Sequence, residues 1–329
     1  MKNIFTKLLC LAMLANAFVL PARAQFTSQL EETTLPVGEF SMVDANGDFE
    51  VSLSKGSYGV RLTTDKNLTP YVQVYVRSNT LYLTYDEKAV PKDIKKLYKG
   101  KDAPKPVFRA VVSLPQLNGL KLDDNVTLQA TEEFFGSNVT ITLNDKSQVR
   151  NLSLRANSIT VTMKKNSQAA LSLTADEKME LNTDDKAILK LTEKAREITL
   201  NAKGGSDNAF SGECELVNLN LSEKSSTNMT QRAQRAVLNV GGSSKLNLNG
   251  TADILEVRGD KNAEVEAATF PVKNMKAELN GSSKVNVAVE KELNVALQGG
   301  STLIFTGSPT ILVNKIVKST LAPAGTSLK

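Results

Sequence analysis

The stretch from Val237 to Leu248 decides the fold, and it runs Val-Leu-Asn-Val-Gly-Gly-Ser-Ser-Lys-Leu-Asn-Leu. Apolar and polar residues alternate on both sides of a Gly-Gly-Ser-Ser turn, which predicts two short, half-buried strands. The phrase returns at 277–287 as Ala-Glu-Leu-Asn-Gly-Ser-Ser-Lys-Val-Asn-Val, and at 295–305 as Val-Ala-Leu-Gln-Gly-Gly-Ser-Thr-Leu-Ile-Phe. A helix would need apolar residues three and four positions apart, and these stretches lack that spacing.

The phrase is one unit of a repeat of about 20 residues that fills the last two thirds of the chain. Its aligned apolar anchors are Leu122, Leu143, Met163, Leu181, Leu200, Leu221, Val240, Val257, Leu279 and Leu297. Single steps between anchors range from 17 to 22 residues. A repeat of this size indicates stacked units, each of which buries its apolar face against its neighbours.

Short strands at this interval are compatible with a β-helix, a leucine-rich horseshoe or a chain of hairpins. The horseshoe needs a convex segment and a fixed asparagine position, and hairpins favour two-residue turns, whereas these turns mostly have four to six residues. A β-helix coil holds about 20 residues and absorbs insertions in its loops. We therefore predict an all-β, right-handed parallel β-helix with coils of three- to five-residue strands.

The chain divides into four parts on this basis. Residues 1–24 form a signal peptide, 37–120 an N-terminal β region of paired strands, 121–318 the repeat solenoid and 319–329 a C-terminal tail. Within the second part, residues 88–105 carry seven lysines and break the strand pattern. We interpret them as an exposed basic loop with one helical turn at 93–98. The tail and the segment before Phe40 are placed to cap the ends of the solenoid.

The first residues have the features of a secretory leader. Lys2 and Lys7 precede an apolar run that is too short to span a membrane, and a small-residue cleavage site predicts cutting between Ala24 and Gln25. No later stretch is apolar enough to span a bilayer. We therefore expect a protein secreted across the inner membrane, located in the periplasm or on the cell surface.

The composition argues against several kinds of chemistry. Histidine is absent, which removes the commonest general base and the commonest metal ligand. Tryptophan is also absent, which weakens the case for a large aromatic platform for sugars. Beyond the leader only Cys214 remains, so packing alone must stabilise the fold. The mature chain has 37 basic and 35 acidic residues, a net charge of +2. We expect no cofactor, no metal and no nucleic-acid partner.

Two groups of residues are candidates for binding. On neighbouring strands of the N-terminal region, Tyr71, Tyr75 and Tyr82 are predicted to form an outward aromatic patch that could stack on a sugar or a partner protein. Ordinary cross-strand pairing is the simpler interpretation. The basic loop could attract an anionic ligand through its lysines, although a solvated loop is the simpler explanation. These lysines are Lys92, Lys95, Lys96 and Lys99.

Acidic residues supply the argument for an enzyme. Carboxylate catalysis needs two acids on one face, about 5–10 Å apart, and adjacent acids on a strand point to opposite faces. Asp124 and Asp145 fall at nearly equivalent turn positions of successive coils. Turn acids usually serve solubility, so we predict no enzymatic activity and name no catalytic residue.

Several stretches resemble the bacterial family of putative auto-transporter adhesins, head GIN domain. The resemblance lies in residues 40–53, the strand-Pro-Gln-Leu-Asn-Gly-Leu stretch at 111–120, the Gly-Ser-Ser-Lys turns at 242–245 and 281–284, and Thr-Gly-Ser-Pro at 306–309. It implies a right-handed β-helix and brings no catalytic residues with it. The long basic insertion departs from the family pattern, as do the early turns without glycine.

These observations favour a secreted, adhesin-like binding protein that presents a ladder of polar side chains to a cell-surface glycan or an envelope protein. There are two alternatives. One is a carbohydrate-active enzyme on the same scaffold, either a polysaccharide lyase or a hydrolase, and the other is a purely structural envelope protein. Self-association into a homo-oligomer through a coil face is a further expectation.

Overall fold

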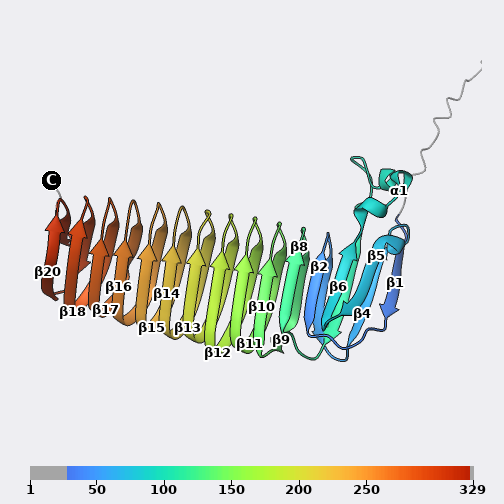
Figure 1. Ribbon diagram of the computed structural model, residues 1–329, viewed down its shortest axis with the longest axis horizontal. Helices are drawn as coiled ribbons and strands as arrows, with labels where there is room; N and C mark the ends of the chain where they lie inside the picture. The colour runs from blue at the N-terminus through green and yellow to red at the C-terminus, as the bar shows by residue number, and fades with distance from the viewer. Residues whose placement is uncertain (1–27, 327–329) are drawn as a thin grey trace, which may run out of the picture.

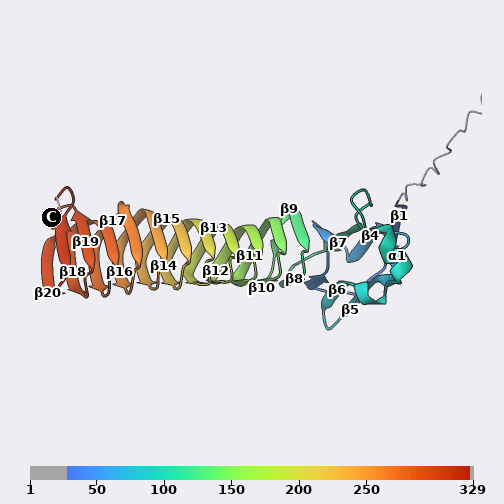
Figure 2. The ribbon, with the colours of Figure 1, turned by 90° about the horizontal axis from the view of Figure 1, so that it is seen from above.

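The protein is a right-handed parallel β-solenoid of about 11 coils, which confirms the predicted fold (Figure 1). The computed structural model describes residues 28–326, so the predicted signal peptide and its cleavage site lie outside the described residues. In Figure 1 the front strands rise, the chain returns behind them and the coils advance from right to left. Seen from above, the coils stack evenly, with α1 (Lys92–Leu97) at the N-terminal end (Figure 2).

Each regular coil is one long strand that bends in its middle. The regular coils are β11 (Gln148–Met163), β12 (Gln168–Thr183), β13 (Ile188–Ala202), β14 (Asp207–Leu221), β15 (Ser226–Val240), β16 (Lys245–Gly259), β17 (Glu264–Leu279) and β18 (Lys284–Gln298). The expectation of strands of three to five residues is therefore wrong. The first half of each strand descends at the back of Figure 1 and the second half rises at the front.

The lower bend needs no turn because the residues facing inward there are small. Ala156, Ala175 and Ala195 stack in register at this corner, and Ala233 and Ala252 continue the column. Small side chains leave room for the strand to bend sharply. Register shifts lie beside the bend, as between Ala175 and Lys178, so bulges here absorb differences in coil length.

The upper corner is a four-residue turn closed by a backbone hydrogen bond. In the first regular turn, the N–H of Ser147 donates to the carbonyl of Asn144 at 3.0 Å. The second residue of each of these turns has a positive φ. It is glycine in some coils and another residue in others, such as Lys165. The last turn residue points inward and is mostly serine; Ser225 and Ser244 hydrogen-bond to each other at 3.2 Å.

The register of the coils corrects part of the anchor alignment. Met163 pairs with Thr183 rather than Leu181, and Val240 pairs with Gly259 rather than Val257. Ala202 likewise takes the position assigned to Leu200. The equivalent positions are Leu122, Leu143, Met163, Thr183, Ala202, Leu221, Val240, Gly259, Leu279 and Leu297. The steps between equivalent positions are therefore 18 to 21 residues long. The predicted range is wider because, in three coils, the predicted anchor is a larger apolar residue two positions earlier.

The N-terminal region continues the solenoid, but its coils do not stack in chain order. Its strands are β1 (Leu30–Leu35), β2 (Met42–Asn46), β3 (Glu50–Lys55), β4 (Gly59–Asp65), β5 (Val72–Arg77), β6 (Thr80–Tyr85), β7 (Phe108–Leu114), β8 (Gly119–Asp123), β9 (Thr127–Phe135) and β10 (Asn138–Leu143). β2 lies between β6 and β8, and β3 lies between β7 and β9, all in parallel. The first coil along the chain is therefore the second coil in space.

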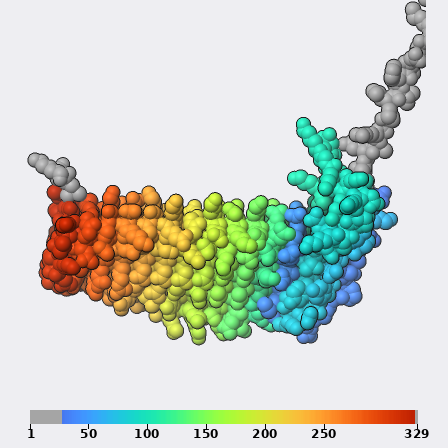
Figure 3. All heavy atoms as spheres, turned by 45° about the horizontal axis from the view of Figure 1, so that its top comes forward, coloured from blue at the N-terminus to red at the C-terminus, as the bar shows by residue number. Residues whose placement is uncertain are grey.

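Antiparallel strands and a short helical segment close the N-terminal end. β4 pairs with β7, β5 pairs with β6, and β1 pairs with β4, all antiparallel. The segment after β6 contains η2 (Glu87–Ala89) and α1, and it projects from the rod in Figure 3. Val90 from this segment is buried, and Ile94 and Tyr98 pack on the hydrophobic core. Burial and the carboxylate of Asp65 raise the pKa of Tyr98.

The C-terminal end is built differently. β19 (Thr302–Thr306) and β20 (Thr310–Val317) both stack on β18, and β21 (Thr320–Pro323) stacks on β19, all in parallel. Residues 320–323 of the expected tail thus belong to the last coil.

Gly242 offers a test of the upper turns. Its φ is +72°, and a Cβ there would lie 2.6 to 2.9 Å from backbone atoms of Glu223 on the neighbouring coil. Gly242→Ala should lower the free energy of unfolding by about 1–2 kcal/mol from the left-handed conformation alone, with the clash adding to this. Urea denaturation measures the change. Gly38→Ala is the control, since a Cβ at Gly38 meets nothing within 4 Å; equal stability of the two variants would contradict this account of the turn.

Candidate functional site

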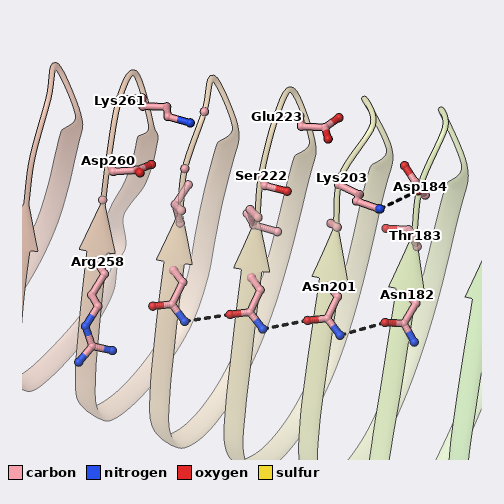
Figure 4. A pocket seen from close by; sticks show the side chains of 18 of the residues that line it. Asn182, Thr183, Asp184, Asn201, Lys203, Ser222, Glu223, Arg258, Asp260 and Lys261 are labelled. Carbon is pink, nitrogen blue, oxygen red and sulfur yellow. Dashed lines mark hydrogen bonds and ion pairs between the residues drawn. The ribbon is translucent and has the colours of Figure 1, made fainter.

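A groove runs along the rising face of the rod, just below the upper turns (Figure 4). It encloses about 960 Å³ and crosses six successive coils. Outward-facing residues near the ends of the strands form its floor, from Thr162 to Arg258. The first residues of the turns, among them Asp184, Ser222 and Asp260, form its upper wall.

Four asparagines make a continuous ladder on the floor of this groove. They are Asn182, Asn201, Asn220 and Asn239, one from each of four neighbouring coils. The side-chain Nδ2 of each later residue donates to the Oδ1 of the one before it, and all three distances are 2.9 Å. Amides stack in this way because parallel strands in register place identical side chains one strand spacing apart.

The ladder ends at Thr162 on one side and at a charged residue on the other. Beyond Asn239 the next coil supplies Arg258, whose Nε donates to Glu278 at 3.3 Å. On the upper wall, Lys203 pairs with Asp184 at 3.2 Å (Figure 4). The groove lining holds charges of both signs, so no strong field of one sign covers the amides. They are Lys164, Lys203, Arg258 and Lys261, and Asp184, Glu223 and Asp260.

The spacing of these asparagines in the sequence is a signal for this site. The four asparagines are separated by 19 residues each, an interval equal to the coil length in this part of the rod. A polar residue that recurs at the coil length must form a column on one face. The prediction of a ladder of polar side chains along the solenoid did not name these four asparagines.

The three candidate tyrosines are only partly brought together. Tyr75 and Tyr82 lie opposite each other on β5 and β6, and their rings stack with centroids 5.0 Å apart. Tyr75 is exposed and Tyr82 is half-buried. Tyr71 lies in η1 (Thr69–Tyr71), before β5 begins, and it packs against the hydrophobic core. An aromatic surface on this end would therefore consist of two rings.

The candidate lysines lie on and just after α1. Lys92, Lys96 and Lys99 are exposed, and Lys95 is half-buried. Among the residues that the structure describes, none of the four forms an ion pair. They lie at the N-terminal end of the rod, far along the axis from the asparagine ladder (Figure 1).

The turn acids form one close pair, but it is not the pair expected from the repeat. Burial, and then a hydrogen bond with Asp145, raise the pKa of Asp123. Lys165 also contacts Asp145, with Nζ 3.1 Å from Oδ2. Two carboxyls in direct hydrogen-bond contact are closer than the 5–10 Å separation used in glycoside hydrolysis. Within residues 28–326, no cluster of three or more histidines, cysteines or acids could hold a metal ion.

A polar cluster also lies inside the rod, near the lower bend. The inward column of Phe134, Leu154 and Leu173 continues with Glu193, Gly212, Gln231 and Gly250 on successive coils. Glycine follows each long polar residue because the neighbouring backbone is too close for a side chain. A Cβ on Gly212 would lie 1.9 Å from the backbone oxygen of Glu193 and 2.6 Å from its carboxyl group, and a Cβ on Gly250 would lie 2.0 Å from the backbone oxygen of Gln231. The two mid-strand glycines were the only sequence signal of this cluster.

Burial controls the ionisation of this cluster. Glu193 is only 4% exposed, and desolvation raises its pKa to about 7. The Nε2 of Gln231 donates to Cys214 Sγ at 3.1 Å. Burial raises the pKa of the Cys214 thiol to about 12, so this cysteine stays protonated and is a poor nucleophile at neutral pH.

The fold and the groove together define a rod-shaped parallel β-solenoid with a lateral polar groove. A family model described as "Putative auto-transporter adhesin, head GIN domain" matches residues 39–211 and 203–309. The chain belongs to this family. No curated protein matches it. Within residues 28–326, no helix has the length and apolar character needed to cross a bilayer.

Solved structures of similar chains are distant in sequence. A putative adhesin from Bacteroides fragilis NCTC 9343 is 16% identical with a TM-score of 0.29, covering 90% of this chain and 98% of its own. A putative adhesin from Parabacteroides merdae ATCC 43184 is 15% identical with a TM-score of 0.36, covering 90% and 96%. A putative lipid binding protein from Parabacteroides distasonis ATCC 8503 is 13% identical with a TM-score of 0.30, covering 90% and 96%.

Glu193 should give the protein an unusual pH dependence. Its pKa is higher in the folded state than in the unfolded chain, so the folded state holds this proton more tightly. The resulting stabilisation is complete below the unfolded pKa of about 4.3 and is lost as the pH rises towards 7. Glu193→Gln should therefore match the native protein at pH 4 and exceed its free energy of unfolding by roughly 3 kcal/mol at pH 8.

Urea denaturation of both proteins at several pH values measures this difference. The exposed Glu213, whose pKa is lowered by Lys194, provides the control Glu213→Gln, for which the pH trend should run the other way. A constant difference between Glu193→Gln and the native protein at all pH values would show that Glu193 does not titrate in this range.

Proposed function

We propose that this protein is a secreted, non-catalytic, adhesin-like binding protein of the cell envelope, located in the periplasm or at the cell surface. Its ligand is an extended glycan that lies along the asparagine ladder. The observation that carries this proposal is the ladder itself, with four amides in one groove at a regular spacing. The family description supports an adhesin-like role.

The amides of the ladder keep hydrogen-bonding capacity for a ligand. An asparagine amide has two N–H donors and a carbonyl oxygen with two lone pairs. Each bond of the ladder uses one donor of one residue and one lone pair of the next, so a residue such as Asn201 retains one donor and one lone pair. Sugar hydroxyls both donate and accept, so they can use both.

The dimensions of the groove suit a chain-like ligand better than a small one. The six coils from Thr162 to Arg258 span about 24 Å, at about 4.8 Å for each strand spacing. A polymer with a regular repeat could make the same contacts on successive coils. Since Lys203 and Arg258 are already paired with acids, the ligand does not need a charge.

The stacked Tyr75 and Tyr82 could provide a second contact for a sugar or a partner protein at the N-terminal end. An envelope protein as ligand, a lyase or hydrolase activity and a purely structural role are the competing possibilities. In support of a non-catalytic role, the sequence has no histidine, and the carboxyl pair of Asp123 and Asp145 is hydrogen-bonded and contacted by Lys165.

The test is a binding screen of the whole protein against a glycan array and purified envelope polysaccharides. Asn201→Ala combined with Asn220→Ala should weaken glycan binding by about tenfold or more, because two pairs of ligand hydrogen bonds are lost. The control combines Asn228→Ala with Asn247→Ala, which removes a similar stacked pair, at 2.8 Å, outside the groove. A third protein carries Tyr71→Ala, Tyr75→Ala and Tyr82→Ala.

Each outcome distinguishes one possibility from the others. Binding that survives loss of the ladder but not of the tyrosines would move the site to the N-terminal end. Shortened or unsaturated sugar products after incubation would contradict the non-catalytic role. An absence of glycan binding would contradict the glycan proposal and favour a protein partner or a structural role.

A further inference from the structure

The C-terminal end of the rod carries the largest group of exposed apolar residues in the described part of the chain. Residues 28–326 have eleven exposed large apolar residues, and five of them lie on β20: Ile311, Leu312, Val313, Ile316 and Val317. The remaining six are scattered singly over the N-terminal end and the coils. Clustered exposure of this kind marks an interaction surface rather than ordinary surface composition.

Three of these side chains continue inward-facing columns of the core but are not covered on their outer side. Ile311 stacks on Leu293, Val313 on Val295 and Ile316 on Leu297, and these three partners are fully buried. The β20 residues continue the same inward columns, yet they are 38%, 55% and 41% exposed, in that order. In the part of the chain that the structure describes, β20 is the outermost strand at this end and no coil covers them (Figure 1).

The backbone of β20 is also unpaired on its outer edge. Within residues 28–326 its only strand partner is β18. The strand has eight residues and a single charge, Lys315, whose Nζ donates to Gln298 Oε1 at 2.7 Å. Long apolar edges without prolines or inward charges are the kind that native proteins usually cover or pair.

The N-terminal end cannot serve as the complementary surface. Leu68 and Val90 are buried there, and Ile94 and Tyr98 pack on the core beneath them. The outermost strand of that end, β1, carries Glu31 and Glu32. The N-terminal end is closed and charged, whereas the C-terminal end is open and apolar. Head-to-tail stacking would therefore place an apolar surface against a charged one.

We propose that the open end binds the same end of a second copy, forming a tail-to-tail dimer with two-fold symmetry. β20 of one copy pairs antiparallel with β20 of the other, with the axis between Val313 and Asn314. This register places Ile311 of each copy opposite Ile316 of the other. The contact completes the core layer of both copies and leaves no free β20 edge, so association stops at two.

The size of the contact is sufficient for a specific dimer. The last coil, residues 307–326, supplies about 20 residues from each copy, which is the lower end of the range of about 20–30 residues a side in stable interfaces. Its centre is apolar, and the charged Lys315 lies on the outer face beside Gln298.

Sedimentation of the whole purified protein tests the proposal. The native protein should change from monomer to dimer as its concentration rises, with no larger species. Val313→Lys should weaken association by about 100-fold or more, since it brings two like charges together near the axis. Val313 is already half-exposed, so the rod should keep its fold, which circular dichroism and thermal unfolding verify. Ile254→Lys, at a 39% exposed residue on the side of the rod, should leave association unchanged.

A native protein that stays monomeric, an open-ended series of oligomers, or equal association of the native protein and Val313→Lys would each overturn the proposal. A second test traps the dimer with a disulfide bond and does not depend on weakening its association. In a Cys214→Ala background, Asn314→Cys should form a disulfide-linked dimer under mild oxidation, because the two copies approach closely at this position. Thr251→Cys, on the side of the rod, should not; crosslinking that is equal at both positions, or absent at Asn314→Cys, would exclude the tail-to-tail contact.

Discussion

Parallel hydrogen bonding between successive coils is the constraint on which the rest of this structure depends. Each coil lies in register on the one before it, so each residue must be acceptable as a neighbour of its equivalents above and below. The columns of alanines at the lower bend and of serines at the upper turn follow from this requirement. So does the ladder of asparagines in the groove, since an exposed amide finds its best partner in an identical amide one strand spacing away.

This constraint explains which features could be predicted from the sequence. The interval of about 20 residues and the alternation of apolar residues indicated the parallel β-helix correctly. The predicted anchor was two residues too early in the coils of Thr183, Ala202 and Gly259. In these coils the inward residue is small or polar, and a leucine, or in one coil a valine, lies two residues earlier. Both residues face the core, so alternation alone cannot distinguish them. Backbone pairing across the whole coil can.

Other features depended on pairings between distant segments. The insertion of β2 and β3 between later coils has no local signature, because each of these strands would fit a solenoid in chain order equally well. Tyr71 followed the alternation of β5 in the sequence but lies in the turn before that strand, where it packs on the core. The asparagine groove was predictable in kind, through the 19-residue interval, but the turns that wall it became evident only in three dimensions.

The stacking order of the N-terminal coils also determines when the rod can begin to form. β2 and β3 emerge before β6 to β9 from a chain made from its N-terminus, yet each lies between two of those later strands, and β9 ends only at Phe135. The strands from β2 to β9 must therefore assemble together, through contacts between segments as far as 77 positions apart, such as Asp44 and Lys121. After that, each regular coil stacks on the coil before it in the chain. We therefore expect a slow, cooperative start at the N-terminal end and faster, local addition of the later coils.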